Sequence, residues 1–285
     1  MENIKRINRT FQPSSITKMI LSLLLALMSH SSFAQNILRQ TVYSTKMDKN
    51  INVVVISPPF ETGVNYKTVY ILHGYSGNAE RTYQKDLPDL VKKAEKYQTI
   101  YVLADGNYNS WYVDSPIDAT SQYQTFIGEE LVAFIDANYP TLPNKENRGI
   151  LGWSMGGFGA LHIGIAHPTT FSIVGSSCGA INLVAFEKEY ADYQIDKVLG
   201  KREDVPLKYQ LLDNEDQMKN TGQYYILDCG TEDTQMIQMN RTFHRQLTAK
   251  NIEHSYTEYK GEHNTAYWSK ALAIQLALFD AFFQK

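Results

Sequence analysis

Cysteine is scarce in this chain of 285 residues, which contains only Cys178 and Cys229. Two cysteines cannot supply the set of bridges that holds small disulfide-rich domains together, so the fold must rest on a hydrophobic core. On the strand pattern described below, both residues end neighbouring strands, where the geometry for a bridge is poor. We therefore expect two buried, free thiols.

An excess of charge of either sign is also lacking. The chain carries 27 basic and 30 acidic residues, of which four basic and one acidic lie in 1–34. The remainder has 23 basic and 29 acidic residues, a net charge of −6. A mildly acidic chain of this kind argues against nucleic acid or an anionic membrane as a partner.

No hydrophobic run reaches the roughly 20 apolar residues that a membrane-spanning helix needs. A shorter run at 19–28 follows four basic residues and precedes Ser32-Phe33-Ala34, which has small residues at the positions that signal peptidase reads. No cysteine follows the run, which argues against a lipid anchor. This pattern predicts a signal peptide over 1–34, cleaved after Ala34, and a secreted or periplasmic mature chain without a membrane partner.

Repeats, low-complexity tracts and Gly/Ser linkers are absent from Gln35 onward, so we predict one domain over 35–285. Short apolar runs alternate with helical patterns, and continuous apolar runs are typical of parallel strands covered on both faces. This alternation predicts an α/β fold with a mostly parallel, doubly wound sheet. The predicted strands are Ile51–Ile56, Thr68–Leu72, Thr99–Leu103, Gly149–Gly152, Phe171–Gly175, Tyr224–Leu227 and His254–Tyr259; the clearest helices are Ser121–Asn138, Gly157–His167, Asp233–Lys250 and Asn264–Phe283.

Residues 181–222 interrupt this alternation with a long, polar, tyrosine-rich stretch between two predicted strands. Connections of this length are usually functional or inserted elements. We expect a small helical excursion near the site described next.

The motif Gly152-Trp153-Ser154-Met155-Gly156 has the form G-x-S-x-G, with a predicted strand before it and a predicted helix after it. In that context the motif is typical of a nucleophile on a tight strand-to-helix turn, whose flanking positions must be glycine to avoid clashes. Ser154 is the predicted nucleophile.

A serine hydroxyl needs a general base, and in this order of motifs the base is a histidine near the end of the chain. Of the three C-terminal histidines, His244 falls in a helical pattern and His254 in a strand. His263 lies in a loop that opens at the carboxyl end of the predicted sheet, where sites of α/β proteins form. We therefore predict His263 as the base.

The acid that orients this histidine should follow the strand Tyr224–Leu227, where Asp228, Glu232 and Asp233 are candidates. Asp228 stands at the strand end, where it more plausibly braces the turn. Asp233 is far enough along the loop to face His263 and is the favoured residue, with Asp228 and Glu232 left open.

Two backbone donors are needed to hold the oxyanion of an acyl-transfer reaction. The N–H of Met155, directly after the nucleophile, is one candidate. The second should come from the loop His73-Gly74-Tyr75, and we choose the N–H of Tyr75. His73 is expected to order this loop rather than to act as a base.

Other residues suggest a pocket but no cofactor. Trp111 and Tyr112 follow a predicted strand at the carboxyl edge, and together with Trp153 they are candidates for contact with the substrate, although aromatic side chains there can equally be packing. His162 and His167 share one predicted helix but lack a carboxylate or cysteine at ligand spacing. We expect neither a metal nor an organic cofactor.

The order of these motifs resembles the esterase family of α/β-hydrolases that includes esterase D (S-formylglutathione hydrolase), tributyrin esterase, and the feruloyl and acetylxylan esterases. The resemblance implies an α/β-hydrolase fold and a triad of Ser154, Asp233 and His263. It departs from the S-formylglutathione hydrolases at His73-Gly74-Tyr75, where they have a cysteine-containing loop. The matching stretches are 72–78, 109–112, 129–131, 152–157, 228–233 and 261–263.

These features predict a secreted serine carboxylesterase whose substrate is a small-molecule or oligosaccharide ester, such as an acetyl or feruloyl ester of plant polysaccharide fragments. A thioesterase like S-formylglutathione hydrolase, or an acyltransferase, is the alternative. A carbohydrate-binding module without catalysis is less favoured, because a binder does not need the strained turn around Ser154.

Overall fold

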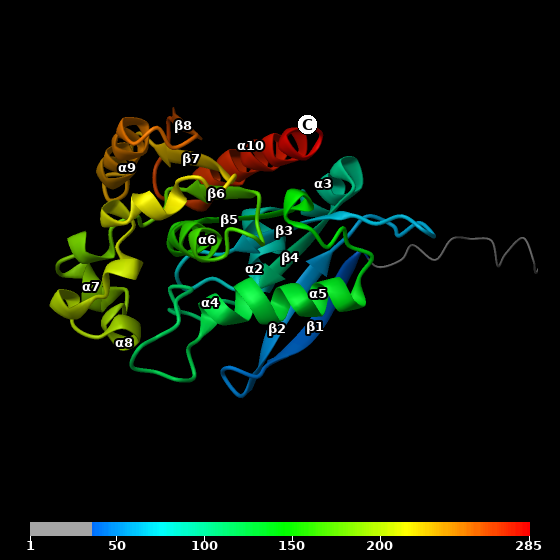
Figure 1. The fold of residues 1–285 in the computed structure, drawn as a ribbon, viewed down its shortest axis with the longest axis horizontal. Coiled ribbons are helices and arrows are strands. Elements are labelled where there is room, and N and C mark those ends of the chain that lie inside the picture. The colour runs from blue at the N-terminus through cyan, green and yellow to red at the C-terminus, as the bar shows by residue number, and fades with distance from the viewer. Residues whose placement is uncertain (1–35) are drawn as a thin grey trace, which may run out of the picture. The chain divides into compact units, whose positions relative to one another are not determined.

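One eight-stranded sheet runs through the computed structural model, which describes residues 36–285 (Figure 1). The strand order is β1-β2-β4-β3-β5-β6-β7-β8. The strands from β3 to β8 run parallel, whereas β2 is antiparallel to both of its neighbours, β1 and β4. Their bounds are Ile37–Ser44 (β1), Lys49–Ile56 (β2), Lys67–Leu72 (β3), Thr99–Ala104 (β4), Arg148–Trp153 (β5), Ile173–Ser177 (β6), Tyr224–Gly230 (β7) and His254–Tyr259 (β8).

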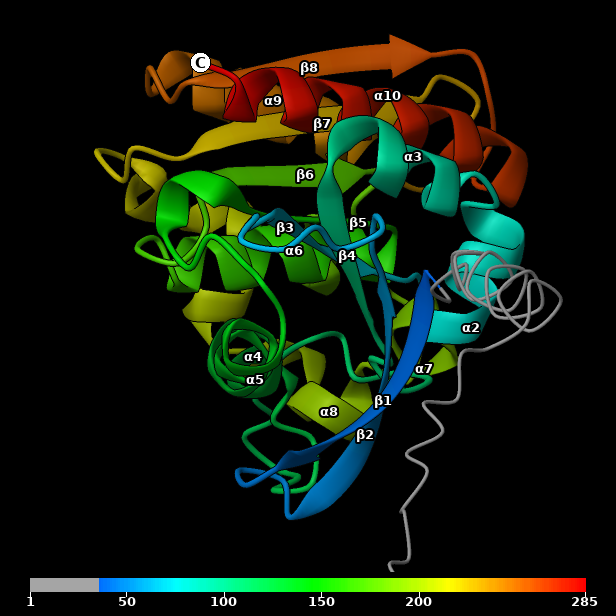
Figure 2. The same cartoon turned by 90° about the vertical axis from the view of Figure 1, so that its right-hand side faces the viewer.

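Helices cover both faces of this sheet (Figure 2). The longer ones are α3 (Leu90–Tyr97), α5 (Leu131–Asn138), α6 (Met155–Ala166), α9 (Ile237–Ala249) and α10 (Thr265–Phe283), and the short α2 (Ala79–Arg81) and α4 (Tyr123–Thr125) continue into the helical turns Thr82–Asp86 and Phe126–Glu130. Leu131, Phe158 and Phe243 place α5, α6 and α9 in one core. Leu90 and Leu276 place α3 and α10 in the other. The predicted doubly wound α/β fold is confirmed.

The central strands form because their side chains are apolar on both faces. Every residue of β4, β5 and β6 is buried. The edge strand β1 was not among the predicted strands, because its buried residues alternate with exposed ones and its sequence ILRQTVYS is largely polar. Strand β6 lies two residues further along the chain than predicted, since Phe171 and Ser172 still belong to the connection that follows the turn at 168–170.

Residues 181–222 form the expected helical excursion. It contains two short helices, α7 (Glu189–Asp192) and α8 (Asp196–Leu199), with one single helical turn before them and several after them. Side chains from the loops at the carboxyl end of the sheet hold this excursion: Asn109 donates to Gln194 (3.0 Å), and the indole of Trp111 donates to the carbonyl of Tyr193 (3.1 Å).

Cys178 and Cys229 are both buried and free. They follow neighbouring strand positions, and the N–H of Cys178 donates to the carbonyl of Asp228 at 2.8 Å. The predicted signal peptide lies outside the described residues. Within residues 36–285, none of the helices has the length and apolar character needed to span a membrane.

Candidate active site

Ser154 occupies the turn between β5 and α6. Its backbone is held at φ 53° and ψ −120°, a conformation that residues other than glycine rarely adopt. Such strain persists only where the surroundings enforce it and is typical of functional sites. The turn brings the hydroxyl to the N-terminus of α6, at the carboxyl end of the sheet.

The glycines of the motif allow this turn to pack against strand β3. A Cβ atom added to Gly156 would lie 2.1 Å from the carbonyl oxygen of Leu72, and one added to Gly152 would lie 2.3 Å from the carbonyl oxygen of Gly156. Both contacts are with backbone, which cannot rotate away as a side chain can. The local sequence is therefore dictated by the close approach of three backbone segments.

We expect Gly156→Ala to lower the free energy of unfolding by about 3 kcal/mol or more, because the added methyl group forces β3 and α6 apart. Urea unfolding followed by tryptophan fluorescence measures this change. Ala160→Gly, in the interior of the same helix, is the comparison variant; it tests helix propensity and a small cavity without a backbone clash. Equal stability of Gly156→Ala and the unchanged protein would contradict the packing argument.

Ser154, His263 and Asp233 are joined by two hydrogen bonds in line. The Nε2 atom of His263 lies 2.8 Å from Oγ of Ser154, and Nδ1 lies 2.6 Å from Oδ2 of Asp233. An ionised carboxylate can only accept, so Nδ1 must carry a proton and donate it. In the neutral ring Nε2 is then the acceptor of the serine hydroxyl. The geometry thus selects the tautomer that can take a proton from Ser154.

Asp233 is nearly inaccessible to solvent and follows β7 on the loop that leads to α9. Its second oxygen, Oδ1, accepts the backbone N–H of Met236 at 3.1 Å, which fixes the carboxylate plane. His263 lies on the loop between β8 and α10, and its ring meets Trp268 edge-on, with centroids 5.1 Å apart. Parallel strands β7 and β8 end at the same edge, which brings these two loops together.

Asp228 is not in contact with His263. Its carboxylate accepts hydrogen bonds from Ser177 (2.7 Å), Tyr267 (2.8 Å) and Gln275 (2.6 Å) inside the sheet edge. Burial raises the pKa of Asp228 to about 6, while these hydrogen bonds oppose that rise. Asp228 therefore ties β6 and β7 to α10, and of the two aspartates only Asp233 reaches the histidine.

The pKa of His263 is raised. Burial by itself lowers it, but the hydrogen bond and charge of Asp233, together with the neighbouring Cys178, outweigh burial and bring the pKa to about 9. An imidazolium at this position is therefore stabilised by a fixed carboxylate.

Two backbone N–H groups lie beside Ser154. That of Met155 is at the first turn of α6, and that of Tyr75 is on the loop after β3; within residues 36–285 neither donates to another protein group. Gly74 allows the two segments to approach, because a Cβ there would lie 2.9 Å from Nε1 of Trp153, the residue before Ser154. Free backbone donors are suited to hold a negative charge, and that of Met155 is favoured further by its place at the N-terminus of α6.

His73 orders the loop that carries Tyr75. Its Nδ1 lies 2.8 Å from the carbonyl of Gly74, and its Nε2 accepts the N–H of Gly106 at 2.8 Å. The hydroxyl of Tyr112 donates to the carbonyl of His73 at 3.0 Å. His73 is buried and does not reach Ser154, so its ring spans two loops instead of facing the site.

A cavity of about 220 Å³ opens above Ser154. Its walls come from the Tyr75 loop, the segment around Arg81, the excursion and the start of α10. The lining residues are Gly74, Tyr75, Ser76, Gly77, Arg81, Asp86, Trp153, Ser154, Tyr193, His263 and Trp268.

Of the three aromatic residues expected at the substrate, only Trp153 lines this cavity. Trp111 and Tyr112 are buried and do not line it, so they pack inside the protein, which is the alternative that the sequence left open. Both have positive φ values, 51° and 55°, and this turn directs their side chains into the protein. They support the cavity from below, Trp111 through Tyr193 and Tyr112 through His73.

Sequence reasoning missed Arg81, Asp86, Tyr193 and Trp268 as cavity residues, because none belongs to a motif. It also missed Cys178, whose sulfur, together with ligand atoms of Asp233 and His263, forms a group within 4.8 Å that has the chemistry of a cation site. Asp233 and His263 of this group are already joined by a hydrogen bond, an arrangement suited to proton transfer.

The fold and the site together define a class: an α/β-hydrolase, with a serine on the turn after β5 and a histidine and an aspartate presented by later loops. The chain belongs to the family described as "Putative esterase", whose model matches residues 44–279. This family places the chain among the carboxylic ester hydrolases.

Individual relatives agree with this grouping. The chain is 28% identical over 263 residues to the acetyl esterase of Caldicellulosiruptor saccharolyticus, covering 83% of this chain and 95% of that protein. Its fold is similar to that of an S-formylglutathione hydrolase from Agrobacterium tumefaciens (TM-score 0.75, 16% identity, 88% and 98% of the two chains). It is also similar to a ferulic acid esterase from Anaeromyces mucronatus (TM-score 0.61, 21% identity, 87% and 93%).

Proposed function

We propose that this protein hydrolyses short-chain carboxylic esters, acetyl esters above all, through a covalent acyl-enzyme on Ser154. The observation that carries the proposal is the continuous hydrogen-bond path from Oγ of Ser154 through His263 to the buried Asp233. A path of this kind serves both to remove a proton from a nucleophile and to return it to a leaving group.

In the first step, Oγ of Ser154 attacks the ester carbonyl while Nε2 of His263 takes the hydroxyl proton. Asp233 stabilises the imidazolium without taking that proton. The tetrahedral oxyanion is held by the N–H groups of Met155 and Tyr75. When the bond to the alcohol oxygen breaks, the imidazolium protonates the alcohol, and the acyl group stays on Ser154.

In the second step, water replaces the alcohol. His263 removes one proton from the water as its oxygen attacks the acyl carbonyl, and the same two N–H groups hold the second oxyanion. The bond to Oγ then breaks, Oγ regains its proton from His263, and the carboxylic acid leaves. The chain supplies all the groups that these steps use, so the proposal invokes neither a metal nor an organic cofactor.

The preference for short acyl groups is supported by the size of the cavity and by the name of a relative that aligns over almost its whole length. Pockets for drug-sized ligands are commonly 300–1,000 Å³, whereas this one is about 220 Å³. The relative that aligns over 95% of its length is named an acetyl esterase. Aromatic walls from Tyr75, Tyr193 and Trp268 suit the apolar faces of a sugar, which is consistent with acetylated oligosaccharides as substrates.

We further propose that the enzyme acts outside the cytoplasm. The support is the sequence of residues 1–34, in which a basic segment, a short apolar run and small residues at Ser32 and Ala34 occur in the order of a signal peptide. N-terminal sequencing of the mature protein from its native host should begin at Gln35.

The test of the proposed function is a series of 4-nitrophenyl esters from acetate to octanoate, with methyl ferulate and an S-acyl thioester as further arms. We expect the highest kcat/KM with acetate or propionate. A fluorophosphonate probe should increase the mass of the peptide that contains Ser154 by that of one phosphonyl group. Absence of turnover on every ester, with no labelling, would leave a binding role as the better explanation.

A further inference from the structure

Arg81 places a cation in the wall of the cavity that contains Ser154. It ends the short helix α2, and within residues 36–285 it is the one lysine or arginine among the residues that line this cavity. Its side chain is 41% exposed. The motifs around Ser154 and His263 do not account for a cation at this position.

Asp86 holds Arg81 in place from below. Oδ2 of Asp86 lies 3.4 Å from Nε of Arg81, and the Asp86 side chain is only 2% exposed. Its other oxygen accepts the hydroxyl of Thr265 at 3.1 Å, and its backbone carbonyl accepts the hydroxyl of Ser269 at 2.6 Å. These two contacts tie the turn Thr82–Asp86 to α10. Asp86 is therefore held in a fixed position, and its carboxylate pairs with Arg81.

The guanidinium of Arg81 retains its hydrogen-bonding capacity. Its Nε is buried without a hydrogen-bond acceptor in the described part of the chain, since the contact with Asp86 is an ion pair of longer range. Burial raises the pKa of Asp86 and Arg81 lowers it, as expected for a carboxyl that faces inward and has one cation beside it. Within the described residues Nη1 and Nη2 of Arg81 donate to no protein group, so the end of the guanidinium is available to the cavity.

We propose that Arg81 binds a carboxylate carried by the ester substrate, so that the preferred substrates are esters of acidic molecules such as uronic acids or dicarboxylic acids. This inference rests on the proposed function. A guanidinium presents parallel N–H groups that match the two oxygens of a carboxylate, a match that neutral hydroxyl groups do not offer. Asp86 keeps the arginine in position, because its own two oxygens are engaged inside the protein.

The experiment compares matched pairs of esters that differ in one negative charge. On the alcohol side the pair is 4-acetoxybenzoate and 4-acetoxybenzamide; on the acyl side it is mono-4-nitrophenyl adipate and 4-nitrophenyl hexanoate. For each pair we measure the ratio of kcat/KM for the anionic ester to that for the neutral ester. In the unchanged protein at low salt we expect a ratio above one for at least one pair, and it should decrease as salt is added.

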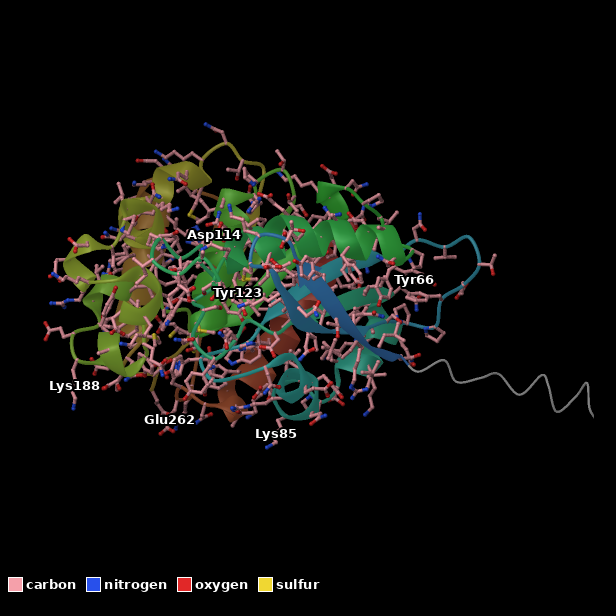
Figure 3. All side chains as sticks on the ribbon, turned by 90° about the horizontal axis from the view of Figure 1, so that it is seen from below. Tyr66, Lys85, Asp114, Tyr123, Lys188 and Glu262 are labelled. Carbon is pink, nitrogen blue, oxygen red and sulfur yellow. The ribbon has the colours of Figure 1, made fainter. Side chains whose placement is uncertain are left out.

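Arg81→Gln should lower that ratio by about tenfold or more, because the charged partner of the carboxylate is lost. The control is Lys85→Gln, which removes a cation four residues along the chain. The side chain of Lys85 extends outward from the molecule (Figure 3) and does not line the cavity. We expect Lys85→Gln to leave the ratio unchanged.

Removal of Arg81 leaves Asp86 without its cation, so the double variant Arg81→Gln/Asp86→Asn serves as a second test in which both charges are absent. Thermal unfolding reports whether each variant is folded, and the ratio should be as low in the double variant as in Arg81→Gln. An unchanged ratio in both variants would show that Arg81 and Asp86 form only a structural ion pair. No turnover of any ester by the unchanged protein would instead contradict the proposed function itself.

Discussion

Replacing Ser154 with alanine is expected to lower kcat for 4-nitrophenyl acetate by about four orders of magnitude or more, with little change in KM. The substitution removes only Oγ, the atom that lies 2.8 Å from Nε2 of His263. Without it no acyl-enzyme can form. The backbone donors of Tyr75 and Met155 and the aromatic walls remain, so substrate binding should persist. Stopped-flow and steady-state assays at saturating ester measure the effect.

Ser255→Ala is the matched control for this experiment. Ser255 is a half-buried serine on the edge strand β8 and does not line the cavity. We expect it to retain full activity and to react with the fluorophosphonate probe, whereas Ser154→Ala should not react. If Ser154→Ala retained more than about 1% of the activity, Ser154 would not be the nucleophile.

The second large effect is expected for Asp233→Asn, which should lower kcat by about 10⁴-fold while the fold is retained. An asparagine can present its N–H₂ group to Nδ1 of His263. The proton of the neutral ring then moves to Nε2, the atom that has to accept the proton of Ser154. The hydrogen bond is kept but the tautomer is wrong, so kcat decreases far more than stability does.

The pH profile distinguishes this role from a structural one. In the unchanged protein the base works only when His263 is neutral, so kcat/KM should rise with pH until about pH 9. Without the Asp233 carboxylate the pKa of His263 decreases, and the inflection should move to lower pH. The pKa of His263 in the folded protein lies above its ordinary value of 6.5. The ion pair with Asp233 therefore stabilises the fold fully below about pH 6.5, and this stabilisation is lost as the pH rises through about 9.

Asp228→Asn is the control for Asp233→Asn, since both are buried aspartates that follow β6 in the chain. Here the amide N–H₂ replaces one oxygen and faces either the hydroxyls of Ser177 and Tyr267 or the amide of Gln275, and an unsatisfied buried donor costs about 1–3 kcal/mol. We expect a lower Tm but an unchanged inflection in the pH profile. A shift of the inflection by Asp228→Asn, and none by Asp233→Asn, would reverse the assignment of the acid.

Much of the architecture could be predicted from the sequence, because central strands and their covering helices are specified by local pattern. The seven predicted strands correspond to β2–β8, and the central strands β4, β5 and β6 are buried on both faces. The strand β1 is missing from the prediction since it lies at an edge and pairs only with β2. Its half-polar sequence becomes a strand through that pairing, a tertiary effect that local pattern does not contain.

For the candidate active site, too, some features could be predicted from the sequence and others depend on tertiary packing. The sequence alone placed Ser154 on a strand-to-helix turn and His263 on a loop at the carboxyl edge, because short motifs encode tight turns locally. The sequence favoured Asp233 but left Asp228 and Glu232 open, and the tertiary structure shows that Asp233 contacts His263. Only the tertiary structure decided that Trp111 and Tyr112 turn inward and that Arg81 enters the cavity. Each of these depends on how loops far apart in the chain pack at one sheet edge, and no short stretch of sequence records that packing.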